Sequence, residues 1–215
     1  DCVEAELVHV SDKHAKRVAY MSVCMAEQLG ISDESLQDLA ACALLHDNAL
    51  TQYIQEELHK DVANVPQASQ VGIHCTLGEK NIQRLPFHTD VKNVILYHHE
   101  NYDGTGYPAN LAGEKIPFGA RILRICDVYC ALTSDRPYRS AFTREQAMEL
   151  MTEEVKNFDL KMFLAFQRVI HSGSRKAIEL SDVDELIREI IKEKTENGIK
   201  EETGYRNERY FTERN

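Results

Sequence analysis

The sequence predicts an all-α fold, and three observations support this expectation. Apolar residues recur at helical spacing along most of the chain, strand signals are scarce, and the composition is that of a folded domain. Of 215 residues, 43% are hydrophobic and 28% are charged, which is enough to bury a normal core. We expect a helical bundle of about seven or more helices, followed by a C-terminal amphipathic helix.

The first half of the chain contains two clear helices. Apolar residues at three- and four-residue spacing from Val10 to Leu29 predict the first helix, and Gly30 ends it. Ser32 is a suitable N-cap for the second helix, which runs through LQDLAACALLHD. The polar stretch 51–73 is ambiguous, and we expect a helix near 52–60 followed by a loop.

The second half begins with a helix over 90–99. The segment 101–117 follows it and is rich in Gly and Pro, which predicts a loop. A long, almost wholly apolar helix is expected over about 119–133. Thr143 and Gln146 then form a capping-box pair that opens another helix.

The remaining elements set the expected domain boundaries. Asp159 is expected to cap a further helix, and an amphipathic helix is expected near 182–197. We expect this last helix to pack on its own domain, and pairing with another chain to form a dimer is the alternative. The expected domains are 1–172 as the main domain, 173–198 as a helical appendage and 199–215 as a polar, flexible tail.

The charge balance of the chain excludes several classes of partner. Acidic side chains outnumber basic ones by 35 to 25, giving a formal net charge of −10. Such a chain has no broad attraction to DNA or to an anionic membrane, although a local site can still bind a small anion. No apolar run approaches the roughly 20 residues of a membrane span. We therefore expect no DNA partner and no membrane span.

The cysteines favour a reducing compartment. The six residues lie at positions 2, 24, 42, 75, 126 and 130, with no CxxC pair. Most lie inside apolar helical stretches, so we expect free, buried thiols in the cytoplasm rather than disulfides. The sequence begins at Asp1 without a methionine or a signal peptide, and we expect an excised domain.

Polar and charged side chains occur at positions where the hydropathy pattern predicts buried apolar residues. Asp127 interrupts the apolar run RILRICDVYCAL, and His46 and Asp47 follow the apolar run LAACALL. A buried, unpaired carboxylate is costly, so it must be neutralised, paired or bound to a metal. Taken singly, Asp127 can pair with an arginine, and His46 can be a hydrogen-bonded core histidine.

The full set of such residues favours a metal centre. His14 lies on the apolar stripe of the first helix, His74 follows an expected helical segment, and His98 and His99 end the helix before the Gly-rich loop. Imidazole and carboxylate ligands without thiolate suit iron or manganese, with zinc, cobalt or nickel as alternatives. Their number fits two divalent ions sharing a carboxylate, an arrangement that hydrolyses phosphate esters.

The local charge suits an anionic substrate. Residues 119–144 carry five arginines against two aspartates, which leaves a charge of +3. Arg136 and Arg139 flank an expected turn, where guanidinium groups can bind phosphate oxygens, and Arg121 lies at the start of the same segment. A solvated basic patch is the alternative. Tyr107 can stack on a base, or it can simply anchor the loop.

Three motifs together resemble the HD-GYP family of the HD phosphohydrolases. They are HHENYDGTGYP at 98–108, His46-Asp47, and RILRICDVYCALTSDRPYR at 121–139. The likeness begins near HAKRV at 14–18, includes His74 with Gly78, and reaches FDLKMFLAF at 158–166, about 150 residues in the family's order. The long HH…DGxGYP signature is highly specific, whereas HD alone is a weak signal.

The resemblance implies a domain, here 1–172, that hydrolyses cyclic di-GMP to pGpG through a hydroxide bridging two metal ions. The implied catalytic residues are His46, Asp47 and Asp127. The implied metal ligands are His14, His46, Asp47, His74, His98, His99 and Asp127, with His99 serving either a third metal or the outer shell. The implied nucleotide contacts are Tyr107, Arg136 and Arg139, to which the basic segment adds Arg121. A sensor or receiver module, or a GGDEF-type protein, is the expected partner.

Three departures from the family pattern bear on activity. Leu50 stands where the family has a lysine that meets the phosphate, and Val10 stands where three-metal members have a glutamate. We therefore expect two metals. The segment 48–70 also differs from the family's loop. These losses support two alternatives: a catalytically impaired domain that binds cyclic di-GMP or a protein, and a hydrolase of another phosphorylated substrate.

Overall fold

The computed structural model describes residues 13–31, 33–50, 72–136 and 139–171, and in these ranges the predicted all-α fold is confirmed. The only β feature there is one isolated antiparallel bridge between Arg136 and Arg139. The helices predicted near 52–60 and 182–197, the polar tail and Cys2 lie outside the described residues.

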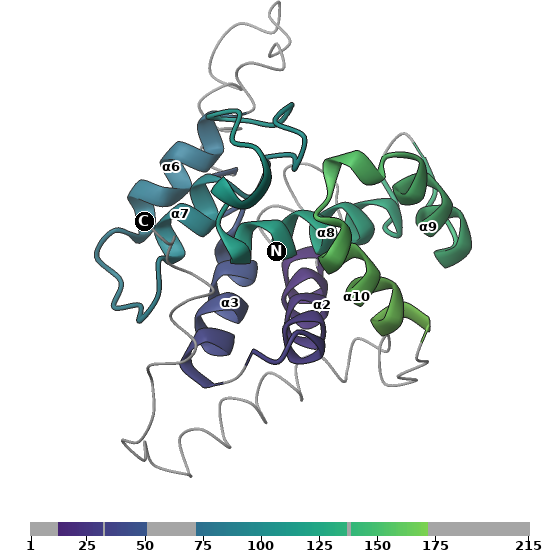
Figure 1. The fold of residues 1–215 in the computed structure, drawn as a ribbon. Coiled ribbons are helices and arrows are strands. Elements are labelled where there is room, and N and C mark those ends of the chain that lie inside the picture. The colour runs from purple at the N-terminus through teal and green to yellow at the C-terminus, as the bar shows by residue number, and fades with distance from the viewer. Residues whose placement is uncertain (1–12, 32, 51–71, 137–138, 172–215) are drawn as a thin grey trace, which may run out of the picture.

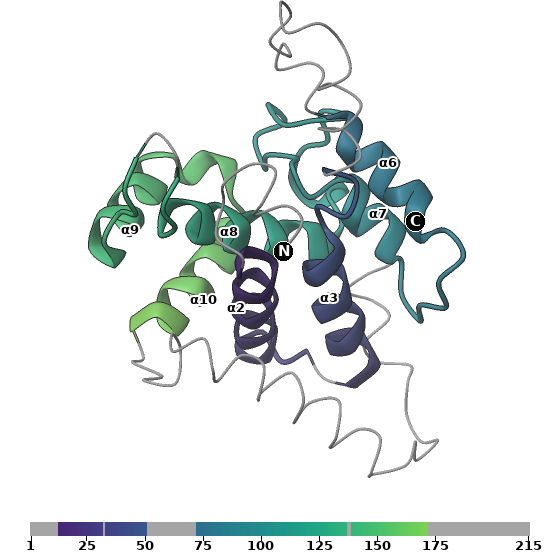
Figure 2. The ribbon, with the colours of Figure 1, turned by 180° about the vertical axis from the view of Figure 1, so that it is seen from behind.

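Helix α8 (Phe118–Leu132) lies in the middle of the described helices, between α6 and α7 on one side and α9 on the other (Figures 1 and 2). Helix α2 packs against α3, α8 and α10, and α7 packs against α3, α6 and α8. Helix α9 packs against α8, on the side away from α6 in both views. The bounds are α2 His14–Gln28, α3 Asp33–Leu45, α6 Ile73–Ile82, α7 Val91–Leu96, α8 Phe118–Leu132, α9 Arg144–Glu153 and α10 Leu160–His171.

The turn between α2 and α3 forms as the sequence predicts. Gly30 has a φ of +76°, a left-handed backbone that glycine adopts without cost. The amide of Ile31 donates to the carbonyl of Ala26 at 3.0 Å, so the last turn of α2 is closed by the chain leaving it. This turn lays α3 beside α2. Ser32, the predicted N-cap, lies outside the described residues.

Two histidine-bearing segments differ from the prediction. His74 lies in the first turn of α6, a helix with little amphipathic pattern that the sequence did not predict, and the helix predicted before it falls outside the described residues. Helix α7 is also shorter than the predicted 90–99, because it ends at Leu96 and leaves His98 and His99 in the following turn. The ring Nδ1 of His98 donates to the carbonyl of Ile95 at 2.6 Å, which satisfies a carbonyl that a longer helix would have used.

The core forms around α8 and α10. Phe166 is fully buried and meets the ring of Tyr129 in an edge-to-face contact at 5.2 Å. The predicted capping box of Thr143 and Gln146 is confirmed, with both of its hydrogen bonds present. Asp159 also caps α10 as predicted, accepting from the amides of the first turn.

The cysteines in the described ranges are free thiols, as predicted. Cys42, Cys75, Cys126 and Cys130 are buried, and Cys24 is partly exposed. Within the described part of the chain, every helix is too short or too polar to cross a lipid bilayer.

Replacement of Phe166 by alanine should destabilise the domain by about 3–5 kcal/mol, because a large buried ring leaves a cavity. Leu164 on the same helix is 47% exposed, so Leu164→Ala is the matched control and should change stability little. Urea denaturation followed by circular dichroism measures both. Equal losses in the two variants would contradict this description of the core.

Candidate metal centre

All the residues predicted as metal ligands converge at one place in the structure. They come from the start of α2, the turn after α3, the first turn of α6, the turn after α7 and the middle of α8. Five of the seven are buried and two are partly buried, and each lies within a few ångströms of another member. They are His14, His46, Asp47, His74, His98, His99 and Asp127.

The first group consists of His14, His46 and Asp127. The Nε2 atom of His14 lies 3.1 Å from Asp127 Oδ1, and Nε2 of His46 lies 3.9 Å from the same oxygen. One donor atom from each residue lies within 4.8 Å of the others, which is close enough to surround a single cation. This is a nitrogen and oxygen donor set.

The carboxylate of Asp47 lies between this group and a second one. Its Oδ2 atom is 3.3 Å from His46 Nε2 in the first group. Its Oδ1 atom is 3.4 Å from His74 Nε2 and 3.7 Å from His98 Nε2 in the second group. The two oxygens of one carboxylate therefore face two different sets of imidazoles, which is the arrangement of a carboxylate that bridges two ions.

The second group contains His74, His98 and His99 together with Cys75. Donor atoms of these four side chains all lie within 4.8 Å of one another. The sequence analysis missed Cys75, because it treated the cysteines as core residues and assumed a donor set without thiol. The available signal was its position directly after His74 in the chain.

Hydrogen bonds to the main chain orient two of the imidazoles. His46 Nδ1 donates to the carbonyl of Ala43 at 2.8 Å, and His98 Nδ1 donates to that of Ile95 at 2.6 Å. A proton on Nδ1 leaves the lone pair of Nε2 facing the cluster. In the described part of the chain, neither Nε2 atom has a hydrogen-bond partner, although both are buried. Buried imidazole nitrogens that have no hydrogen-bond partner and face a common space are suited to coordinate a metal ion.

The electrostatics of the cluster are dominated by the two carboxylates. Burial lowers the pKa of His46, but the neighbouring Asp47 and Asp127 outweigh it and raise this pKa to about 10. Burial raises the pKa of Asp47, yet the charges of the neighbouring His46 and His98, at 3.3 and 3.7 Å, hold that pKa well below its usual range. The carboxylates thus stay ionised and attract positive charge, whether protons or metal ions.

The Gly-rich loop lies directly against the second group. Gly106 leaves no room for a side chain, because a Cβ there would lie 2.2 Å from the amide nitrogen of Asn101. The amide of Tyr107 donates to the carbonyl of His99 at 3.3 Å, and the two rings lie 4.9 Å apart. Buried Glu100 accepts from the amides of Ala109 and Leu111, at 2.6 and 3.0 Å.

The pKa of the Tyr107 hydroxyl is affected by residues of the cluster and by one arginine. Burial raises the pKa of its hydroxyl, the nearby Cys75 adds to the rise, and the positive charge of Arg124 partly offsets it. Arg124 lies one helical turn before Asp127 and donates through Nε to Asn101 Oδ1 at 3.1 Å. The sequence analysis counted Arg124 in the basic segment but did not single it out.

The other arginines have structural contacts. Arg121 pairs with Asp159 at 2.7 Å, and Arg139 donates to the carbonyls of Ala131 and Leu132 at the end of α8. Arg136 pairs with Arg139 through the main chain. None of these bonds joins an arginine to the histidine cluster, so a nucleotide role for Arg121, Arg136 and Arg139 stays a prediction.

The turn that carries His46 and Asp47 is fixed by Asn48. Its side-chain amide donates to the carbonyls of Leu45 and Gly78, at 2.8 and 3.2 Å, which ties the end of α3 to α6. Leu50, at the family's lysine position, lies one turn beyond, where its amide donates to the carbonyl of Asp47 at 2.9 Å. Val10 and 51–70 lie outside the described residues.

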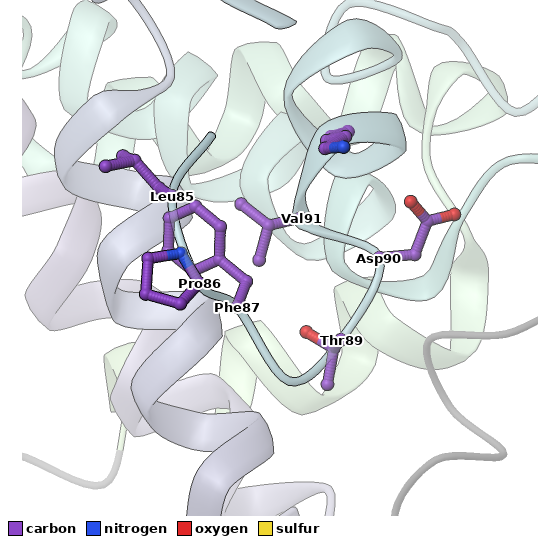
Figure 3. A pocket seen from close by; sticks show the side chains of 7 residues that line it. Leu85, Pro86, Phe87, Thr89, Asp90 and Val91 are labelled. Atoms are coloured by element: carbon purple, nitrogen blue, oxygen red, sulfur yellow. The ribbon is translucent and has the colours of Figure 1, made fainter. Parts of the chain in front are cut away.

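A pocket elsewhere on the domain carries no comparable chemistry (Figure 3). It lies over the connection from α6 to α7 and is lined by both apolar and polar residues of the segment 85–92. Two of its polar side chains are already bonded, since Thr89 Oγ1 donates to Asp38 and Asp90 caps α7. The candidate functional site is therefore the histidine and aspartate cluster.

Comparison with known proteins identifies the family. A family model described as an HD domain matches residues 2–162. The chain belongs to the HD-domain family. This HD domain is 33% identical over 164 residues to the "Cyclic di-GMP phosphodiesterase PA4108" of Pseudomonas aeruginosa, covering 73% of this chain and 38% of that protein. It is also 33% identical over 162 residues to the "3'3'-cGAMP-specific phosphodiesterase 3" of Vibrio cholerae, covering 74% and 35%.

The fold comparison agrees with this assignment. The crystal structure of a cyclic GMP-AMP phosphodiesterase of Vibrio cholerae, V-cGAP3, superposes with a TM-score of 0.65 at 18% identity. The match covers 86% of this chain and 51% of that one. The family model and the curated relatives, together with this shared fold, confirm the predicted resemblance to HD-GYP proteins. The chain spans less than two-fifths of the length of the two curated relatives above.

The substitution Gly106→Ala should destabilise this HD domain more than Gly113→Ala does. Gly113 has a φ of +63° with open space around it, so alanine there costs about 1–2 kcal/mol in backbone strain. Alanine at 106 must also push the loop away from the backbone of 99–101. Chemical denaturation of both variants tests this, and similar losses would show that the close approach at Gly106 is unimportant.

Proposed function

We propose that this HD domain is a metal-dependent phosphodiesterase that hydrolyses a cyclic dinucleotide. The observation that carries the proposal is the carboxylate of Asp47, which lies between two groups of buried donor atoms, 3.3 Å from His46 and 3.4 Å from His74. The names of the relatives agree with it, since they are phosphodiesterases of cyclic di-GMP and of 3'3'-cGAMP.

The residues that would hold two divalent ions divide into two sets joined by Asp47. The first set is His14, His46 and Asp127, and the second is His74, His98 and His99. When bound, the ions would supply positive charge that activates water and stabilises negative charge on phosphoryl oxygens. Iron or manganese suits the first set, and zinc, cobalt and nickel are the alternatives.

The chain's own side chains would bind and orient the substrate. The ring of Tyr107 lies beside His99 at the edge of the cluster and can stack on a base. Arg124 lies on α8 one helical turn before Asp127, on the side of the helix that leads to the cluster, and a guanidinium is suited to bind a phosphate. We propose Arg124 as a substrate contact, in addition to Arg136 and Arg139 beyond the end of α8.

The proposed reaction is the opening of cyclic di-GMP to linear pGpG. Water attacks one phosphorus, one P–O bond to a ribose oxygen breaks, and that oxygen leaves with a proton. The relatives also support 3'3'-cGAMP as a substrate, because it has the same two phosphodiester bonds. Leu50 favours a second candidate function: a domain without the family's lysine can bind the nucleotide and turn it over slowly or not at all.

Asp47→Asn should abolish hydrolysis of cyclic di-GMP, because the amide offers only one oxygen and no charge between the two donor sets. The measurement is product analysis after anaerobic incubation of iron- or manganese-loaded protein with cyclic di-GMP, and separately with 3'3'-cGAMP. Glu114→Gln, on the exposed 3-10 turn, is the charge-matched control and should retain activity. If the unaltered protein binds either nucleotide but forms no product, the phosphodiesterase proposal is wrong and the domain is a nucleotide-binding domain.

Leu50→Lys should raise the rate of hydrolysis. A charge-assisted contact to a phosphate contributes about 1.5–3 kcal/mol, which corresponds to roughly 10- to 100-fold if it is made in the transition state. The comparison is kcat for Leu50→Lys against Leu50→Met, which keeps the length of the side chain without the charge. An equal kcat in both variants would show that the missing lysine does not limit this domain.

A further inference from the structure

The thiol of Cys75 faces the second group of the metal centre. Its Sγ atom lies 3.5 Å from His74 Nε2. This sulfur and the donor atoms of His74, His98 and His99 all lie within 4.8 Å of one another. Cys75 is fully buried, so the thiol lies within the protein and not at a surface. A soft donor thus stands where the sequence analysis expected only imidazoles.

A second observation indicates that this place receives a ligand. His98 Nε2 is buried and has no hydrogen-bond partner among the described residues, and the bond from its Nδ1 to Ile95 aims it at the group. An unpaired, buried nitrogen is costly unless something binds there. The thiol and the unpaired nitrogen face the same space.

The other described cysteines lack these surroundings. Cys42 packs in the core, and its Sγ atom donates a long hydrogen bond to the carbonyl of Val91 at 4.0 Å. Cys126 and Cys130 lie in α8 as members of the same hydrophobic core. Cys75 is the one thiol that joins a group of metal-ligating side chains in the described part of the chain.

We propose that Cys75 is a thiolate ligand of the metal ion held by His74, His98 and His99. The proposal rests on the metal centre proposed above. As the sulfur–metal bond forms, the thiol proton passes to solvent and no electron is transferred. The two halves of the centre then differ, since both have nitrogen donors and an oxygen of Asp47, but only the second adds sulfur.

The sulfur donor changes the expected metal preference of this half. Thiolate is a soft ligand that favours zinc over manganese, whereas carboxylate and imidazole accept manganese or iron. A centre with one half of each kind would bind two different metals when both are supplied. The preference of the second half for zinc over manganese depends on the Cys75 sulfur, so we expect it to be lost in Cys75→Ser.

The first test uses cobalt as a spectroscopic probe. The full chain is loaded with Co²⁺ without oxygen, in a phosphine reductant, because added thiols would themselves bind the metal. A thiolate-to-cobalt charge-transfer band in the near ultraviolet is expected for the unaltered protein, is expected to disappear in Cys75→Ser, and is expected to remain in Cys42→Ala, a buried thiol outside the cluster.

The outcomes separate this proposal from the metal centre itself. Two bound cobalt ions without the band, or a band that persists in Cys75→Ser, would overturn the role of Cys75 and leave the centre intact. Absence of bound cobalt would overturn both. Should Cys75→Ser fail to fold, zinc-edge X-ray absorption of the unaltered protein decides: a sulfur scatterer at about 2.3 Å supports the proposal, and nitrogen and oxygen alone reject it.

Discussion

The carboxylate of Asp47 lies between two sets of buried donor atoms, and the described fold is arranged around it. Its two oxygens face His46 on one side and His74 and His98 on the other, at 3.3 to 3.7 Å. A largely buried carboxylate among imidazoles needs compensating positive charge. The high pKa of His46, about 10, reflects this demand for a cation.

The helices supply this arrangement from segments far apart in the chain. Helix α2 and helix α8 pack on each other and bring His14 to Asp127, and α7 packs on α3 and α6, which brings His98 to Asp47. Between these elements the chain relies on short, specific contacts, such as the bonds of Asn48 to Leu45 and Gly78. The packing of the helices therefore positions the donor atoms of the cluster.

Much of this could be predicted from the sequence. Asp127 within an apolar run and His46 after another one signal buried polar groups, and the caps at Gly30 and Thr143 follow local rules. Features that depend on contacts between distant segments of the chain could not be predicted. Helix α6 has a weak pattern, Gly106 is required by a neighbouring backbone, and the thiol of Cys75 differs from a core thiol only in what surrounds it.

Metal analysis of protein purified without oxygen tests the central claim most directly. The unaltered chain should retain about two divalent ions, and Asp47→Ala should retain fewer, because the carboxylate that joins the two donor sets is gone. A chain that carries no metal, or an Asp47→Ala variant that retains as much as the unaltered chain, would contradict the proposed centre.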